Sequence, residues 1–169
     1  MAEAQTGGQA HAAETFRTQY HLGPGDKIQI NVDGEKDLSM EITVSPHGFI
    51  SYTFLGEISV TGSTIKELET LIRNRLSDGY LRNPRVYVSI VEYRIYFVNG
   101  EVRKSGGFPY RPGLTVRKAI VLAGGFSERA NQDGITVIRG NDASYTERPI
   151  GLNDPLFPGD IITVTEGFW

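Results

Sequence analysis

The chain has 169 residues, of which 39% are hydrophobic and 22% are charged, and its formal net charge is −3, as expected for a globular protein of one domain or two small ones. It contains no basic block and no run approaching the roughly 20 apolar residues that cross a membrane, so the sequence disfavours nucleic-acid binding, polybasic membrane contact and a spanning helix. Because the chain has no cysteine, disulfides, thiolate chemistry, cysteine-based zinc sites and lipid attachment to a cysteine are excluded within it.

The chain begins with a segment of low hydrophobicity. Residues 1–18 are rich in Ala, Gln, Gly and Thr, and they contain neither an apolar core segment nor a basic start, so they do not form a signal peptide. We predict a disordered tail over these residues. Two alternatives follow for the location of the protein: it is cytosolic, or a leader peptide has been removed and Met1 was added.

One turn signal occurs twice, each time before a segment of alternating apolar residues, at 27–32 and at 161–165. Proline presets φ at the second position of a tight turn, glycine supplies the positive φ that the third position of a type II turn needs, and aspartate accepts hydrogen bonds from turn amides. We therefore predict two structural turns, each leading into a strand with one face toward a core. The two copies are Pro24, Gly25 and Asp26, and Pro158, Gly159 and Asp160.

The N-terminal half predicts strands, one helix and a further strand. A turn between two alternating segments predicts a hairpin over residues 40–54. Thr64 and Glu67 have the spacing of a capping box ahead of an apolar stripe with a helical period, which predicts a helix. Strands before and after this helix are expected at residues 58–60 and 86–90.

The C-terminal half predicts a small strand–helix–strand unit of the β-grasp kind. Asn99–Gly100 between β-rich segments is a hairpin signal, with a return strand through residues 108–110. Thr115 is placed to cap a short helix over residues 116–123, which Gly124–Gly125 would end. Further strands are expected at residues 135–139, 145–150 and 161–165.

Residues that carry catalysis in other proteins are not grouped in this sequence. His11, His21 and His47 do not have the spacing of metal ligands, and we expect them in a tail or in turns. Ser63 and Ser127 lie beside glycines but outside a Gly-x-Ser-x-Gly motif. The aspartates of the two turns are expected to cap backbone amides rather than to form a catalytic pair. We predict no catalytic residue, no bound metal and no cofactor.

Aromatic side chains are the main candidates for contacts with a sugar or a partner protein, because flat rings stack on pyranose faces. Ordinary packing is the alternative for each of them. Burial within strands is expected instead for Tyr52, Phe54, Tyr96 and Phe97. The candidate contacts lie near turns, chain ends and module junctions, and they are Tyr80, Tyr93, Tyr110, Phe168 and Trp169.

Two further groups of residues suggest protein contacts. Arg73, Arg75 and Arg82 cluster around the end of the first predicted helix, where they either pair with acids of a neighbouring subunit or form a solvated helix face. Phe168 and Trp169 follow the last predicted strand. They either dock to a partner or to a membrane interface, or fold back over the second module.

Five motifs occur in an order that is typical of one protein family. They are Tyr-His-Leu-Gly-Pro-Gly-Asp at 20–26, Leu-Gly-Glu-Ile-Ser-Val-Thr-Gly at 55–62, Val-Asn-Gly-Glu-Val at 98–102, Ala-Gly-Gly-Phe at 123–126 and Leu-Phe-Pro-Gly-Asp at 156–160. The first two resemble the polysaccharide export domain of Wza-like outer-membrane export proteins, and the others resemble the soluble-ligand-binding β-grasp (SLBB) domain that follows it. The resemblance implies an α+β fold: an export domain over residues 19–93, with a mixed β-sheet and one helix, and one SLBB β-grasp domain over residues 94–169.

The resemblance also implies a function. It indicates a non-catalytic, periplasmic component of capsular or exopolysaccharide export, associated with the outer membrane and forming a ring-shaped conduit. The implied partners are the polysaccharide, further copies of the chain, an inner-membrane polysaccharide co-polymerase and, because the pore helix of long members has no counterpart before Trp169, a separate outer-membrane β-barrel. The alternative is a soluble periplasmic carbohydrate-binding or assembly adaptor that acts as a monomer.

Overall fold

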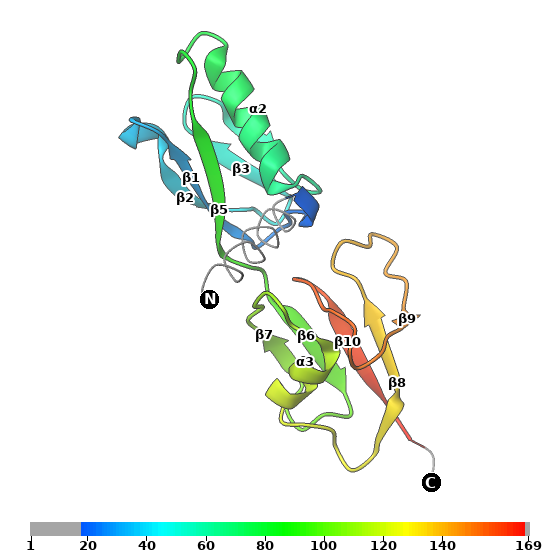
Figure 1. Cartoon of the computed structure of the whole chain (residues 1–169). Coiled ribbons are helices and arrows are strands. Elements are labelled where there is room, and N and C mark those ends of the chain that lie inside the picture. Colours follow the sequence, from blue (N-terminus) through cyan, green and yellow to red (C-terminus); the bar gives the residue numbers. More distant parts are fainter. Residues whose placement is uncertain (1–17, 168–169) are drawn as a thin grey trace, which may run out of the picture. The chain divides into compact units, whose positions relative to one another are not determined.

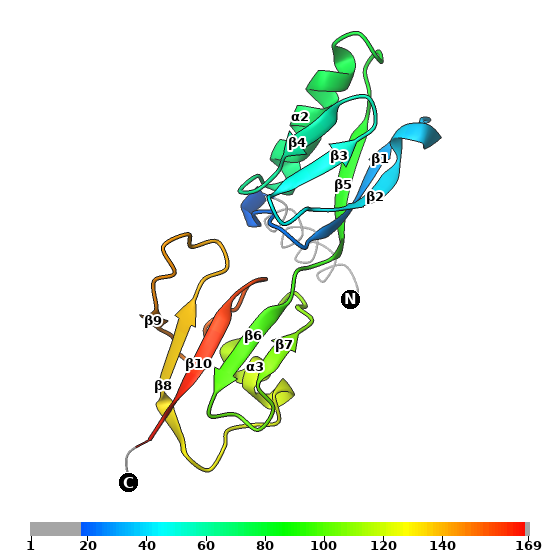
Figure 2. The ribbon, with the colours of Figure 1, turned by 180° about the vertical axis from the view of Figure 1, so that it is seen from behind.

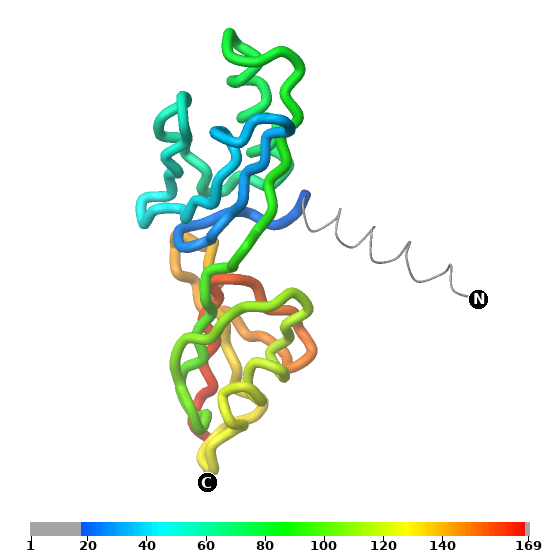
Figure 3. The backbone as a smooth tube through the Cα atoms, turned by 90° about the vertical axis from the view of Figure 1, so that its left-hand side faces the viewer, coloured from blue at the N-terminus to red at the C-terminus, as the bar shows by residue number. Residues whose placement is uncertain are grey.

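The computed structural model describes residues 18–167, and it divides between Glu92 and Tyr93 into two compact units. We call residues 18–92 the N-terminal unit and residues 93–167 the C-terminal unit. Each is built from one continuous stretch of chain, as the colour of the backbone trace shows (Figures 1 and 3). No helix within residues 18–167 combines the length and the apolar character that crossing a membrane requires. The predicted tail up to residue 17, with His11, and the pair Phe168 and Trp169 lie outside the described residues.

The N-terminal unit contains a three-stranded antiparallel sheet in the order β2–β1–β5, a separate two-stranded ribbon of β3 and β4, and one long helix, α2. The helix packs against β5 and lies beside the β3–β4 ribbon in the view from behind (Figure 2). The elements are β1 (Lys27–Val32), a 3-10 helix η1 (Lys36–Leu38), β2 (Met40–Thr43), β3 (Phe49–Tyr52), β4 (Gly56–Ser59), α2 (Ile65–Ser77) and β5 (Val86–Glu92).

The helix α2 forms where the capping pattern predicts it. The Thr64 hydroxyl oxygen accepts a hydrogen bond from the Glu67 backbone N–H at 3.1 Å. The apolar stripe faces inward, and each of its side chains contributes roughly 1.5–3 kcal/mol when buried. The buried residues of the stripe are Ile65, Leu68, Ile72 and Leu76. The prediction of this helix is therefore confirmed.

The predicted hairpin over residues 40–54 is wrong. β2 pairs with β1, and β3 pairs with β4, so the two halves of the expected hairpin belong to different sheets. Two backbone contacts redirect the chain: the Val44 N–H donates to the Asp26 carbonyl at 2.8 Å, and the Val60 N–H donates to the Gly48 carbonyl at 2.9 Å. Alternation predicts that a segment is a strand, but it does not say which strand is its partner.

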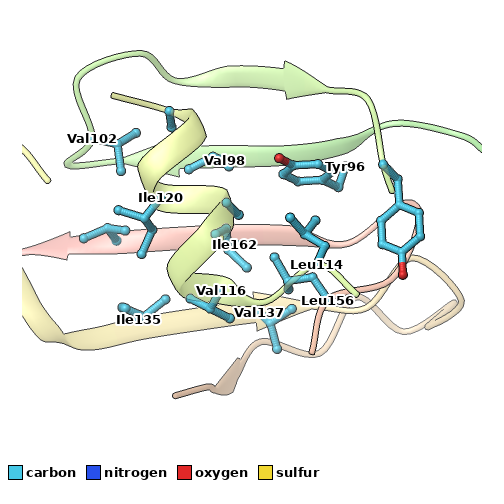
Figure 4. Packing of buried hydrophobic residues seen from close by; sticks show 14 of the residues in the cluster. Tyr96, Val98, Val102, Leu114, Val116, Ile120, Ile135, Val137, Leu156 and Ile162 are labelled. Atoms are coloured by element: carbon cyan, nitrogen blue, oxygen red, sulfur yellow. The ribbon is translucent and has the colours of Figure 1, made fainter. Parts of the chain in front are cut away.

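The C-terminal unit has a five-stranded sheet in the order β7–β6–β10–β8–β9, with β6 and β10 parallel and the other neighbours antiparallel. Side chains of the sheet and of α3 meet in one apolar core (Figure 4). With the N-terminal unit, this confirms the α+β class. The elements are β6 (Tyr96–Gly100), β7 (Gly106–Phe108), α3 (Val116–Leu122), β8 (Ala130–Ile138), β9 (Arg148–Pro149) and β10 (Ile161–Glu166).

Two local predictions in the C-terminal unit need correction. Asn99–Gly100 is not the hairpin turn, because β6 continues through it and pairs with Thr163 and Val164 of β10, so that the connection to β7 lies at residues 101–105. A Cβ at position 100 would lie 2.2 Å from the Val164 carbonyl oxygen, which explains the glycine there. The strand expected at 145–150 is only the two-residue β9, since Tyr145 has φ +52°, outside the β region.

Candidate functional site

The first Pro-Gly-Asp turn is held by its own aspartate. The Asp26 N–H donates to the Gly23 carbonyl at 3.2 Å, and Gly25 takes φ +94°, the left-handed value that the third turn position needs. The buried Asp26 carboxylate accepts from the Gly23 N–H at 3.0 Å and from the Tyr20 hydroxyl at 2.7 Å. Its oxygens thus bind the turn and the segment before it.

The second turn repeats this geometry and adds a cation. The buried Asp160 carboxylate accepts from the Phe157 N–H at 2.7 Å, from the Gly140 N–H at 3.0 Å and from the Arg139 guanidinium at 2.7 Å. Arg139 also lies over the Phe157 ring, 5.5 Å from its centroid. The two aspartates belong to different units and each is engaged by its own turn, so their chemistry here is structural.

The remaining candidates for catalysis occupy ordinary positions. His21 and His47 are exposed, and the His21 Nδ1 atom lies 2.9 Å from the Gly62 carbonyl oxygen. The Ser127 hydroxyl donates to the Glu101 carboxylate at 2.5 Å. Within residues 18–167, no three His, Cys, Asp or Glu side chains are placed to hold a metal ion.

Two buried tyrosines have raised pKa values. Burial raises the pKa of Tyr52 from 10.0 to about 12. Burial, and to a lesser degree the neighbouring Tyr93 and Asp160, raise the pKa of Tyr110 to about 12. Both rings are packing groups of their cores, and the Tyr52 hydroxyl also donates a hydrogen bond to the Leu38 carbonyl at 2.7 Å.

The sequence-based aromatic candidates separate into two kinds. Tyr80 is 54% exposed, and its ring stacks on that of Phe54, with centroids 5.9 Å apart and planes inclined by 30°. Tyr110, in contrast, is only 7% exposed and belongs to the core of the C-terminal unit, with the partly buried Tyr93 packed edge-on against it at 5.2 Å. Tyr110 is thus a packing residue, which corrects its proposed role as a surface contact.

Phe54 was expected to be buried in a strand, and that prediction is wrong. It lies in the turn between β3 and β4 with φ +68° and is 66% exposed. Phe97, also expected to be buried, is 40% exposed on the outer face of its sheet. There it lines a shallow concavity with Asn99, Ser105 and Ile161. The alternation of buried Tyr96 and Val98 with Phe97 is the signal that places Phe97 on the opposite face from the core.

The arginine candidates are all exposed. Arg73 and Arg75 lie in the last turns of α2, and Arg82 follows in the loop to β5. Arg75 lines an open groove along the outer side of the helix together with Lys66, Thr70 and Asn74. Their exposure fits either a solvated surface or a contact with another protein.

Comparison with known proteins gives two matches in order along the chain. Residues 15–91 match the family described as polysaccharide biosynthesis/export protein, and residues 95–149 match the SLBB domain. The exopolysaccharide production protein ExoF of Rhizobium meliloti (strain 1021) is 32% identical over 125 residues, 67% of this chain and 30% of that protein. The polysialic acid transport protein KpsD of Escherichia coli is 29% identical over 140 residues, 80% of this chain and 25% of KpsD. The chain thus spans less than a third of the length of these relatives.

Proposed function

Because the chain belongs to the polysaccharide biosynthesis/export family and carries an SLBB domain after its export domain, we propose that it is a non-catalytic periplasmic component that moves a capsular polysaccharide or exopolysaccharide across the outer membrane. The observation that carries this proposal is the ordered pair of domain matches. The relatives are named for exopolysaccharide production and polysialic acid transport, which supports the same class of cargo. As protein partners we propose an inner-membrane co-polymerase and an outer-membrane protein.

The finer part of the proposal is that several copies form a ring. A ring needs two different, complementary surfaces on each subunit. The exposed Arg73 and Arg75 lie on opposite flanks of α2, which packs against β5, and make the last turns of this helix a positively charged surface. The exposed Asp33 and Asp37 supply an acidic surface in the connection from β1 to β2. Since β5 and β2 are opposite edges of the sheet β2–β1–β5, these surfaces suit a head-to-tail contact between copies.

Deletion of the gene in its native host tests the transport role. Secreted polysaccharide should fall strongly, polymer should accumulate in the cell, and expression of the chain from a plasmid should restore secretion. Unchanged secretion in the deletion strain would refute the proposed function. A loss of polymer both inside and outside the cell would instead indicate a role in synthesis.

Sedimentation velocity of the purified chain tests the ring. We expect self-association that increases with concentration, is weakened by the double change Arg73→Glu and Arg75→Glu, and is restored when Asp33→Lys and Asp37→Lys are added. A monomer at every concentration would favour the second candidate, a monomeric carbohydrate-binding adaptor. The observation that supports this second candidate is the exposed aromatic pair Phe54 and Tyr80.

A further inference from the structure

We propose that Phe54 and Tyr80 form a carbohydrate-binding platform on which a pyranose ring of the transported polymer stacks. This inference rests on the proposed function for the identity of its ligand class. The two residues come from different connections of the N-terminal unit, the turn between β3 and β4 and the loop after α2. Their rings stack on each other, yet each keeps more than half of its surface exposed. We call this pair the aromatic platform.

The backbone that presents the platform is unusual. The described residues with positive φ that are not glycine are Phe54, Asn83 and Tyr145, and the first two lie in the loops that carry the platform. The Leu55 N–H donates to the Tyr52 carbonyl at 3.2 Å, which closes a turn with Phe54 at its third position. Glycine is favoured at that position of a type II turn. Phe54 therefore occupies a backbone conformation that is sterically unfavourable for a large side chain. Residues in such conformations are concentrated at ligand-binding sites.

Both rings are attached to well-anchored backbone. Tyr52, the first residue of the turn, is buried, and its hydroxyl donates to the Leu38 carbonyl. The Tyr80 N–H and the Leu81 N–H both donate to the Leu76 carbonyl, at 3.2 and 2.8 Å. The platform therefore exists before any ligand arrives, so little ordering entropy remains to oppose a weak ligand.

The surroundings favour a sugar over a protein as the occupant. A stable protein interface buries about 800 Å² on each partner, whereas an aromatic side chain buries about 150–250 Å², so two rings are too small a patch to hold a protein. The adjacent Arg82 and Asn83 are exposed and polar. A pyranose has an apolar C–H face, which stacks on an aromatic ring, and hydroxyls at its edge, which form hydrogen bonds. The rings of Phe54 and Tyr80 suit the C–H face, and the side chains of Arg82 and Asn83 suit the hydroxyls.

The test is an NMR titration of the full-length, 15N-labelled chain with two probes, cellohexaose as a neutral oligosaccharide and an α2,8-linked sialic acid hexamer as an anionic one. At least one probe should shift amide signals at residues 53–56 and 79–83 in a saturable way, with a dissociation constant on the order of 1 mM. Phe54→Ala and Tyr80→Ala should each weaken binding by about tenfold, the loss expected when one stacked ring is removed.

Two control variants separate loss of the rings from misfolding and from non-specific stacking. Phe54→Gly removes the ring but suits the positive φ of the turn, so its loss of binding does not come from misfolding. Tyr145→Ala removes another exposed ring at positive φ, in the C-terminal unit, and should leave binding unchanged. Three results would each overturn the platform. One is that neither probe shifts the amide signals up to about 10 mM. The others are that Phe54→Gly and Tyr80→Ala leave the shifts unchanged, or that Tyr145→Ala loses as much binding affinity as they do.

The deletion strain separates this inference from the proposed function. If deletion abolishes secretion while the purified chain binds neither probe, the platform is refuted and the transport role stands. If the deletion strain secretes normally while the chain binds a probe through Phe54 and Tyr80, the platform stands and the transport role is refuted.

Discussion

The two units contain the same Pro-Gly-Asp turn, but different parts of the fold hold it in place. In both turns, the aspartate carboxylate accepts a hydrogen bond from the backbone N–H of the residue three positions earlier. This donor is Gly23 for Asp26 and Phe157 for Asp160. The hydrogen bonds to the rest of the fold differ. The Asp26 carboxylate accepts a hydrogen bond from the Tyr20 hydroxyl, whereas the Asp160 carboxylate accepts one from the guanidinium of Arg139, which follows the end of β8. The local sequence thus determines the turn, while its tertiary partner is a property of the whole unit.

The largest effect is expected from Asp160→Ala. The change leaves the N–H groups of Phe157 and Gly140 without their acceptor, and it leaves the Arg139 guanidinium with the Pro155 carbonyl but without its ion pair. Each polar group left without its partner costs about 1–3 kcal/mol, and the partly exposed Arg139 adds less because solvent reaches it. The free energy of unfolding of the C-terminal unit should therefore fall by about 2–5 kcal/mol in urea titrations followed by circular dichroism. A loss below about 1 kcal/mol would show that solvent replaces the carboxylate in this turn.

Double-mutant cycles sharpen the comparison of the two turns. The cycle of Asp160→Asn with Arg139→Gln should give a coupling energy of about 1–3 kcal/mol, because both partners are charged and Arg139 is partly exposed. The cycle of Asp26→Asn with Tyr20→Phe should give a smaller coupling energy, about 1–2 kcal/mol, because the tyrosine hydroxyl is a neutral donor. Equal couplings would mean that the charge of Arg139 is screened and adds nothing to the second turn.

The next effect concerns alkaline pH. Tyr52 and Tyr110 each have a pKa of about 12 in the folded chain instead of 10.0. The folded state therefore keeps the phenolic proton to higher pH than the unfolded state does, so this contribution to stability is complete below pH 10 and is lost as the pH rises to about 12. Two pKa units correspond to about 2–3 kcal/mol for each residue.

The measurement is the urea midpoint at neutral pH and at several values between about pH 10 and pH 12. Tyr52→Phe should reduce the alkaline loss of stability in the N-terminal unit, and Tyr110→Phe should reduce it in the C-terminal unit. Asp160→Asn should also lower the pKa of Tyr110, since Asp160 is one of the charges that raise it. A pH dependence that Tyr52→Phe and Tyr110→Phe leave unchanged would assign the alkaline transition to other groups.

The elements that the sequence predicts well are those whose cause is local. The helix α2 follows from the Thr64 cap and an apolar stripe, and both turns follow from proline and glycine at fixed positions. The hairpin predicted at residues 40–54 is wrong because strand partners depend on contacts such as that of Val44 with Asp26, which no local pattern encodes.

The candidate site was predictable only in part, for the same reason. Tyr80 stands out from its place after a helix, but its partner Phe54 reads as a buried strand residue, and a phenylalanine gives no sign that its φ will be positive. Tyr110 reads as a surface residue near a turn, but its ring packs edge-on against Tyr93 and interacts with Asp160, and both residues are distant from it in the sequence. Burial of a single aromatic residue depends on which elements meet above it.

A smaller effect is expected when the turn glycines are replaced by valine. Gly25 has φ +94° and Gly159 has φ +83°, so a β-branched residue is strained at either position by about 1 kcal/mol or more. At Gly159 a Cβ would also lie 2.7 Å from the Arg94 Nε atom and 3.2 Å from the Gly140 Cα atom. We expect lower melting temperatures for both variants, with Gly159→Ala as a control for strain without branching. Unchanged melting temperatures would show that the turns tolerate negative φ.

The smallest effect compares the exposed aromatic residues at positive φ, one in each unit. Replacing either Phe54 or Tyr145 by glycine relieves about 1 kcal/mol of backbone strain. Phe54→Gly also removes a stacked ring pair worth about 0.5–1.5 kcal/mol, whereas Tyr145 stacks on no other ring within residues 18–167. Tyr145→Gly should therefore raise the free energy of unfolding, while Phe54→Gly leaves it nearly unchanged. Equal gains in both variants would show that the contact between Phe54 and Tyr80 stabilises nothing, and that the two rings lie together without holding each other in place.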